Sequence, residues 1–215
     1  MKKIILLALT ALLFQPVFSQ SEKYMGAMKK NIAEIDSIFK SNEMNRLNDI
    51  AATFERIGDA EKTQWLPYYY AAYCQVTLAF VKNEVANNDI VADKVDQLIA
   101  KADALQPKNS ELSLLKAMNN SLRMLVNPMQ RWQQYGAKVQ QYTQDAMTQD
   151  PANPRPHYFS GVSLKNTPEQ FGGGCGTAKP VFEKALALFA TFKPATELHP
   201  NWGWLVCQKE AEGCK

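Results

Sequence analysis

The sequence has few of the side chains from which catalytic and metal sites are built. It contains two histidines, His157 and His199, which stand next to Pro156 and Pro200. It has no Cys-x-x-Cys pair, no His-Glu-x-x-His segment, no serine nucleophile elbow and no phosphate-binding loop. The glycine-rich run 171–176 lacks the lysine and hydroxyl of a phosphate loop, so it is interpreted as a connection between helices. These absences predict a protein that is not an enzyme and that holds no metal and no cofactor.

Runs of like charge and low-complexity segments are also missing, and this argues against a disordered chain. The formal net charge is +3. The first 19 residues carry two lysines and no acid, so their removal would leave a charge of +1. A balance so close to neutral gives no electrostatic basis for binding nucleic acid or an acidic membrane.

One long apolar run is present, at the N-terminus. It covers residues 4–14 and follows Lys2 and Lys3. This layout is typical of a secretory signal, here cleaved after Ser19. The run is shorter than the ~20 residues that span a bilayer, and no cysteine follows it to carry a lipid. We therefore expect a periplasmic or secreted mature chain, 20–215, with no integral membrane segment after signal cleavage.

The four cysteines fit no zinc-binding spacing, and export favours their oxidation. Cys74 lies in an apolar helical stretch and is expected to be buried. Cys175 stands in the glycine-rich run, while Cys207 and Cys214 lie in the tail. This placement predicts a Cys175–Cys214 bridge, with Cys175–Cys207 as the alternative.

After the N-terminal run, apolar residues recur every three or four positions, as on one face of a helix. No segment shows the two-residue alternation of a strand, so the predicted fold class is all-α. The periodicity predicts helices over 24–40, 45–61, 65–82, 89–106, 110–126, 131–149, 156–164 and 178–192, with a short tail helix from Gly203.

The helical pattern repeats at a nearly constant interval. Segments 106–110 and 150–154 each end a helix with a proline and restart the chain with a capping residue. Four predicted helices share a spacing of four and then three between apolar or small residues. Its central positions are 54, 99, 143 and 182, which lie 45, 44 and 39 residues apart. Such an interval predicts stacked helix pairs that share one core.

The last of these segments carries a family resemblance. Ala178, Phe182 and Ala185 are spaced as in the second helix of a tetratricopeptide repeat (TPR). Segment 155–161 resembles the first helix of that repeat, with Gly161 at its small-residue position. The resemblance implies antiparallel helix pairs stacked into a short right-handed, TPR-like superhelix, with the first helix of each pair on the concave side.

Two other segments, 105–109 and 148–153, resemble the closing turns of the same repeat. The repeat interval exceeds the usual value of about 34 residues, and Lys116 stands where a small residue is expected. The resemblance implies one domain with repeats over about 27–192 and a C-terminal cap over 193–215.

A narrower similarity lies near the C-terminus. Segments 168–174, 192–194 and 199–203 are similar to exported repeat proteins of Bacteroidetes. This similarity implies an architecture and a compartment, and it implies no reaction.

The most unusual segment, 65–73, contains a tryptophan and four tyrosines. On one helix Trp65, Tyr69 and Tyr73 share a face. Two interpretations are open for them, ordinary core packing or binding anchors on the concave wall.

Together these patterns favour an exported scaffold that binds a protein or peptide partner. The alternative is a small-ligand-binding protein associated with transport, in which the aromatic segment would line an enclosed cavity of roughly 300–1,000 Å³.

Overall fold

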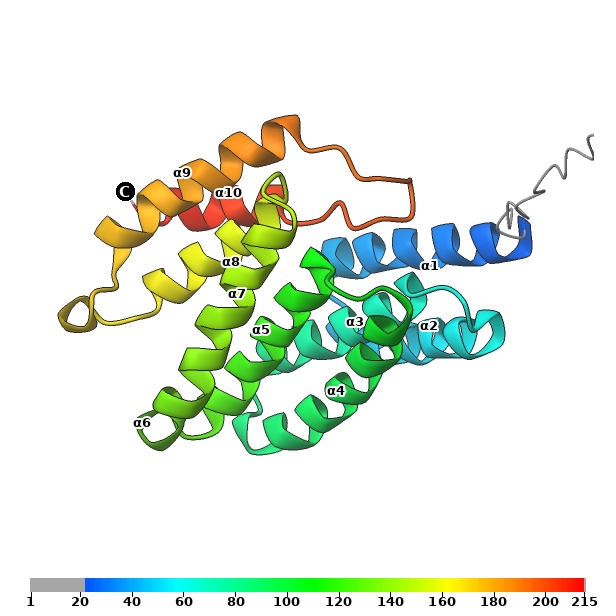
Figure 1. Ribbon diagram of the computed structural model, residues 1–215, viewed down its shortest axis with the longest axis horizontal. Helices are drawn as coiled ribbons and strands as arrows, with labels where there is room; N and C mark the ends of the chain where they lie inside the picture. The colour runs from blue at the N-terminus through cyan, green and yellow to red at the C-terminus, as the bar shows by residue number, and fades with distance from the viewer. Residues whose placement is uncertain (1–21, 215) are drawn as a thin grey trace, which may run out of the picture.

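The computed structural model describes residues 22–214, and within that range every regular element is a helix (Figure 1). The predicted all-α class is confirmed. The predicted signal, residues 1–19, lies outside the described residues. Within the described range, no helix combines the length and the apolar character needed to cross a bilayer.

The helices match the predicted segments closely. In chain order they are α1 (Glu22–Ser41), α2 (Leu47–Glu61), α3 (Leu66–Lys82), α4 (Asn88–Leu105), α5 (Ser110–Val126), α6 (Pro128–Arg131), α7 (Ala137–Gln149), α8 (Pro154–Lys165), α9 (Cys175–Thr191) and α10 (Trp204–Glu212). The segment predicted as one helix over 131–149 is divided, because a π-helical turn, Trp132–Gly136, separates α6 from α7.

Both predicted closing turns lead into capped helices. The side chain of Asn109 accepts hydrogen bonds from the backbone N–H groups of Glu111 and Leu112 at the start of α5. Asn153 does the same for Arg155 at the start of α8. Each cap satisfies backbone donors that a helix N-terminus leaves without partners. The two turns therefore present equivalent helix N-termini.

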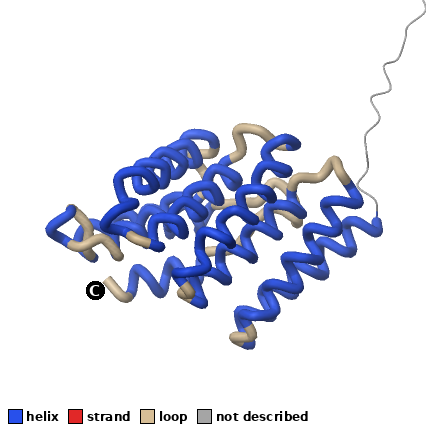
Figure 2. The backbone as a smooth tube through the Cα atoms, turned by 90° about the horizontal axis from the view of Figure 1, so that it is seen from below, coloured by secondary structure: helices blue, strands red, loops and turns tan. Residues whose placement is uncertain are grey.

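Successive helices lie side by side, as Figure 2 shows. The four central positions of the repeat, Phe54, Ile99, Thr143 and Phe182, are all buried. Position 161 requires a glycine, because a Cβ there would come within 2.6 Å of the Phe182 ring. The repeat interval in the sequence thus identifies residues that are buried where neighbouring helices pack.

The buried apolar side chains form two clusters. The main core is built mostly from α1 to α5 and includes Ala146 of α7 and Leu198 from the C-terminal segment. Its central helix is α3, which is buried on nearly every side and contains Cys74, as predicted. The C-terminal core is smaller and joins α8, α9 and α10 around Phe182 and Cys207.

Residues 192–203, which we call the crossing loop, connect α9 to α10. In Figure 1 the loop runs from α9 towards α1 before it returns to α10. Glu197 forms a 2.6 Å ion pair with Lys29 of α1, and the backbone oxygen of Leu198 accepts a 2.9 Å hydrogen bond from Tyr70 of α3. The segment predicted as a cap, 193–215, thus has two parts, because α10 covers α9 while the crossing loop reaches the main core.

Candidate functional site

The aromatic residues singled out by the sequence do share one side of α3. The Tyr69 and Tyr73 rings are stacked with centroids 6.2 Å apart, and Trp65 meets Tyr69 edge-on at 5.8 Å. Tyr69 is 1% exposed and Tyr73 is 6% exposed, whereas Trp65 is half-buried. Trp65 lines the cavity described below, and the two tyrosines do not.

The crossing loop covers the two tyrosines. The indole of Trp202 stacks on Tyr73 with ring centroids 4.7 Å apart. Its Nε1 donates a 2.8 Å hydrogen bond to the hydroxyl of Tyr69. The binding role predicted for Tyr69 and Tyr73 stays a prediction, and a ligand would reach them only after this loop had moved.

A buried ion pair, Glu111 with Arg155, lies beside these rings. The Nε of Arg155 donates to both carboxylate oxygens of Glu111, at 2.9 and 3.1 Å, and Nη2 donates to one of them. Asn153 donates to the same carboxylate at 2.6 Å, and Tyr69 donates to it at 3.2 Å. Arg155 is 1% exposed. The guanidinium also packs against the ring of Phe192, 4.6 Å away. The pair therefore joins α3, α5, α8 and the crossing loop.

Next to this ion pair is a cavity of about 390 Å³. It lies where the α4–α5 turn, the α7–α8 turn and the crossing loop meet, and Trp65 closes one side. Its volume falls within the usual range for small-molecule sites. The tyrosines do not line it, which differs from the cavity expected from the sequence.

His199 is the histidine that lines this cavity. Its Nδ1 is 2.7 Å from the hydroxyl of Thr196, and its ring meets Trp65 edge-on at 5.7 Å. Burial lowers the pKa of His199, an effect that the Glu111 carboxylate opposes and the Arg155 charge reinforces. The imidazole is therefore neutral at pH 7, which is the form that binds metal ions.

His157 stands apart from the cavity. It lies in α8 and is 7% exposed, as expected for a packed side chain. Burial lowers its pKa, with a further contribution from Lys184.

The tyrosine phenols are held in the protonated state. Burial is the largest cause that raises the pKa of Tyr69 and of Tyr73 well above the ordinary value. Among the described residues, no group of three or more His, Cys, Asp or Glu side chains could hold a metal ion.

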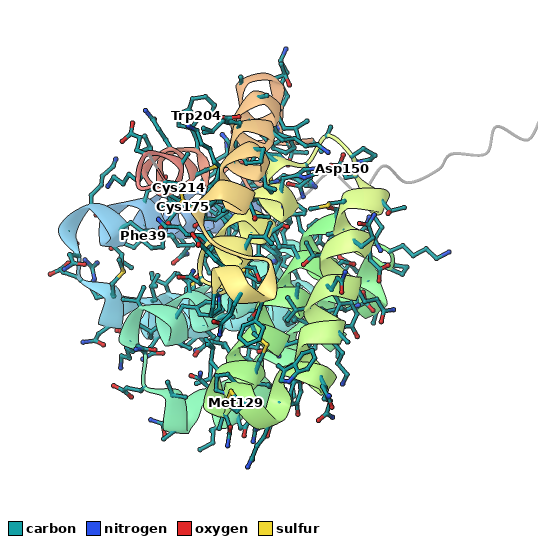
Figure 3. All side chains as sticks on the ribbon, turned by 90° about the vertical axis from the view of Figure 1, so that its left-hand side faces the viewer. Phe39, Met129, Asp150, Cys175, Trp204 and Cys214 are labelled. Atoms are coloured by element: carbon teal, nitrogen blue, oxygen red, sulfur yellow. A yellow bond between two sulfur atoms is a disulfide. The ribbon has the colours of Figure 1, made fainter. Side chains whose placement is uncertain are left out.

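The structure pairs Cys175 with Cys214, so the predicted bridge is confirmed and the alternative to Cys207 is wrong (Figure 3). Cys207 is a buried thiol whose backbone lies one turn into α10. Burial, with help from Glu210, raises its pKa to about 11. Cys74 is buried as well, and burial raises its pKa further still.

Sequence reasoning did not find the Glu111–Arg155 pair or the contacts of Trp202. One signal for the pair was present. Glu111 and Arg155 are 44 residues apart, which equals the repeat interval between positions 99 and 143. Residues in the same phase of neighbouring repeats lie next to each other in a stacked array.

The chain is similar to one known structure over nearly its whole length. That structure is described as the HusA haemophore from Porphyromonas gingivalis, a member of the Bacteroidetes. The two share 33% sequence identity and superimpose with a TM-score of 0.80, over 91% of this chain and 94% of the other. No family model matches the chain, and no curated protein sequence does.

Proposed function

The chain belongs to the family of the HusA haemophore, and from that premise we propose that it is an exported small-ligand-binding protein whose ligand is haem. The observation that carries the proposal is the 33% identity to a haemophore over nearly the full length of both chains. Export is proposed from the N-terminal signal pattern. These findings favour the small-ligand alternative over the protein-binding scaffold.

The cavity beside Trp65 is the site that we assign to the ligand. Most of the residues that line it are polar or charged, and its apolar surface comes from the rings of Trp65 and Phe192 together with Ala195 and Pro200. Flat aromatic and apolar surfaces suit a porphyrin face. His199 brings a neutral imidazole, and histidine is a common axial ligand of haem iron.

Tyrosine is the other side chain of this region that can ligate haem iron. It does so as a phenolate, and burial raises the pKa of Tyr69 and Tyr73 away from that form. Both are also covered by Trp202. We therefore assign the ligand role to His199.

The protein-binding scaffold stays a second candidate because one end of the molecule exposes large apolar side chains. Met129 is 87% exposed and Trp132 is 58% exposed, on the α6 segment and the π-helical turn after it. The right-handed TPR-like superhelix also stays a prediction, supported by the stacked helix pairs. A binding function accords with the prediction that the chain is not an enzyme.

The test is a titration of the mature chain with ferric haem, followed by the Soret absorbance. We expect saturable binding, and we expect His199→Gln to weaken it about tenfold or more, since a lost metal-ligand contact has effects of at least that size. His157→Gln is the matched control, because His157 lies outside the cavity.

If both variants bound haem as tightly as the wild type, His199 would not be a ligand of the haem iron. If the wild-type chain gave no change in Soret absorbance, the haem proposal would be wrong and the protein-binding scaffold would be the favoured function.

A further inference from the structure

We propose that the cavity recognises the carboxylate groups of its ligand, using Arg155, Lys108 and Lys193. This inference rests on the proposed function, because the acidic groups of haem are its two propionates. It goes beyond that function by assigning a polar end to the site and by predicting which porphyrins are bound.

Arg155 has an unused donor at the cavity. Its Nε and Nη2 are engaged by Glu111, but Nη1 is buried and has no hydrogen-bond partner among residues 22–214. A buried donor without a partner is unfavourable, and more so when it carries a charge. Arg155 lines the cavity, so a carboxylate bound against its guanidinium would complete this donor.

Two lysines stand at the mouth of the same cavity. Lys108 belongs to the α4–α5 turn and Lys193 to the crossing loop, and both are exposed. Neither forms an ion pair with any residue that the structure describes. Their ammonium groups are therefore available to an anion.

The helix ends strengthen the positive potential. Helices α5 and α8 begin at Ser110 and Pro154, and Ser110, Asn153 and Arg155 at these two N-termini line the cavity. A helix N-terminus carries a partial positive charge that favours anions.

The acids at the cavity do not cancel this charge. Glu111 is already neutralised by Arg155, and the carboxylate of Asp150 accepts a 3.0 Å hydrogen bond from the backbone N–H of Ala152. Three cationic side chains thus face two carboxylates, and His199 is neutral. The net charge of the lining favours an acidic ligand.

The experiment compares ferric haem with its dimethyl ester, in which both acids are blocked. We expect the wild-type chain to bind the ester about tenfold or more weakly, since hydrogen bonds to charged groups are worth about 1.5–3 kcal/mol. Lys108→Met and Lys193→Met should each weaken haem binding about three- to fivefold, as for exposed ion pairs. Neither should change ester binding.

The double variant Lys108→Met/Lys193→Met should lose most of the preference for haem over its ester. Lys82→Met is the matched control, an exposed lysine at the other end of α3 from Trp65, and it should keep the full preference. These lysines make no ion pair that folding depends on, so the variants test binding and not stability.

Each outcome gives a distinct answer. Equal binding of haem and ester by the wild type overturns the carboxylate inference and leaves haem binding intact. A full preference in the double variant removes Lys108 and Lys193 from the acid-binding groups and also overturns the inference as stated. If the wild type binds neither porphyrin, the proposed function itself fails, and the inference fails with it.

Discussion

The main core buries apolar side chains mostly from the five successive helices α1 to α5, whereas the C-terminal core joins three helices around a handful of buried residues. The large cluster contains a free, buried Cys74. The small cluster contains the Cys175–Cys214 disulfide, which joins the start of α9 to the end of the chain. Small cores supply less stabilisation than large ones, and a cross-link offsets the difference.

The candidate site lies beside the elements that connect the two cores. The crossing loop and the Glu111–Arg155 pair link them, and both also border the cavity. A ligand in the cavity would therefore contact the crossing loop and the ion pair, and its binding would stabilise this connection.

Breaking the ion pair should have the largest effect on stability. Arg155→Met leaves the Glu111 carboxylate buried without its counter-charge, so we expect the free energy of unfolding to fall by about 3–5 kcal/mol. Urea denaturation followed by circular dichroism measures this loss. Replacing both partners, as Arg155→Met/Glu111→Leu, should recover part of it. A single variant as stable as the wild type would show that the pair does not hold this connection between the cores.

Removing the disulfide should be the next largest effect. The bridge spans 39 residues, for which Cys175→Ser/Cys214→Ser is expected to lower stability by about 3–4 kcal/mol. Hydrogen exchange should show faster opening in α9 and α10 than in α3, because the bridge holds only the C-terminal core. Uniform acceleration along the chain would contradict the division into two cores. Cys74→Ala removes a thiol without a bridge and serves as the control.

Two glycine substitutions, one in a helix of each core, should change stability by smaller amounts and in opposite directions. Gly161→Ala would place its Cβ against the buried ring of Phe182, and we expect a loss of about 1–3 kcal/mol. Gly26→Ala, in α1, meets no atom within 4 Å and should gain up to about 1 kcal/mol from helix propensity. Thermal unfolding of both variants gives the comparison. If both substitutions changed the stability in the same direction, the close approach of α8 and α9 would not be needed for stability.

Acid should produce the smallest change, and it should act on the C-terminal half. Burial lowers the folded-state pKa of His157 and of His199, so the unfolded chain binds more protons at mildly acidic pH. The stabilisation is complete above the unfolded pKa near 6.5 and is lost as the pH falls through the folded values. Calorimetry from pH 7.5 to 5 should therefore show a falling Tm. The double variant His157→Gln/His199→Gln should show a smaller fall of Tm with pH. An unchanged slope would show that neither histidine causes the fall.

Much of the architecture could be predicted from the sequence because its helices carry strong local signals. The segment predicted over 110–126 is α5 without change, and the closing turns provide its Asn109 cap. The Cys175–Cys214 bridge could be predicted because one cysteine lay in a glycine-rich turn and the other at the chain end. The division of the helix predicted over 131–149 could not, because a π-helical turn has no distinct apolar period.

The candidate site was harder to predict for a physical reason. Residues 192–203 have no periodicity, and loop paths depend on tertiary contacts that a sequence pattern does not encode. Trp202 and His199 enter the site only through that path. Trp65 lines the cavity, while Tyr69 and Tyr73 pack beneath the loop, and the binding role predicted for the three stays a prediction.

The proposed haem site is the cavity bordered by Trp65, the crossing loop and the Glu111–Arg155 pair. Paramagnetic broadening tests it most directly, because ferric haem selectively weakens the NMR signals of nearby amides, and the diamagnetic zinc porphyrin gives the reference. We predict that the broadened amides cluster at 108–111, 153–155 and 192–200, around the cavity. Met129 lies far from Asp150 at the opposite end of the view in Figure 3, so its surroundings provide the contrast. Broadening centred on 125–136, with sharp signals around the cavity, would contradict the account.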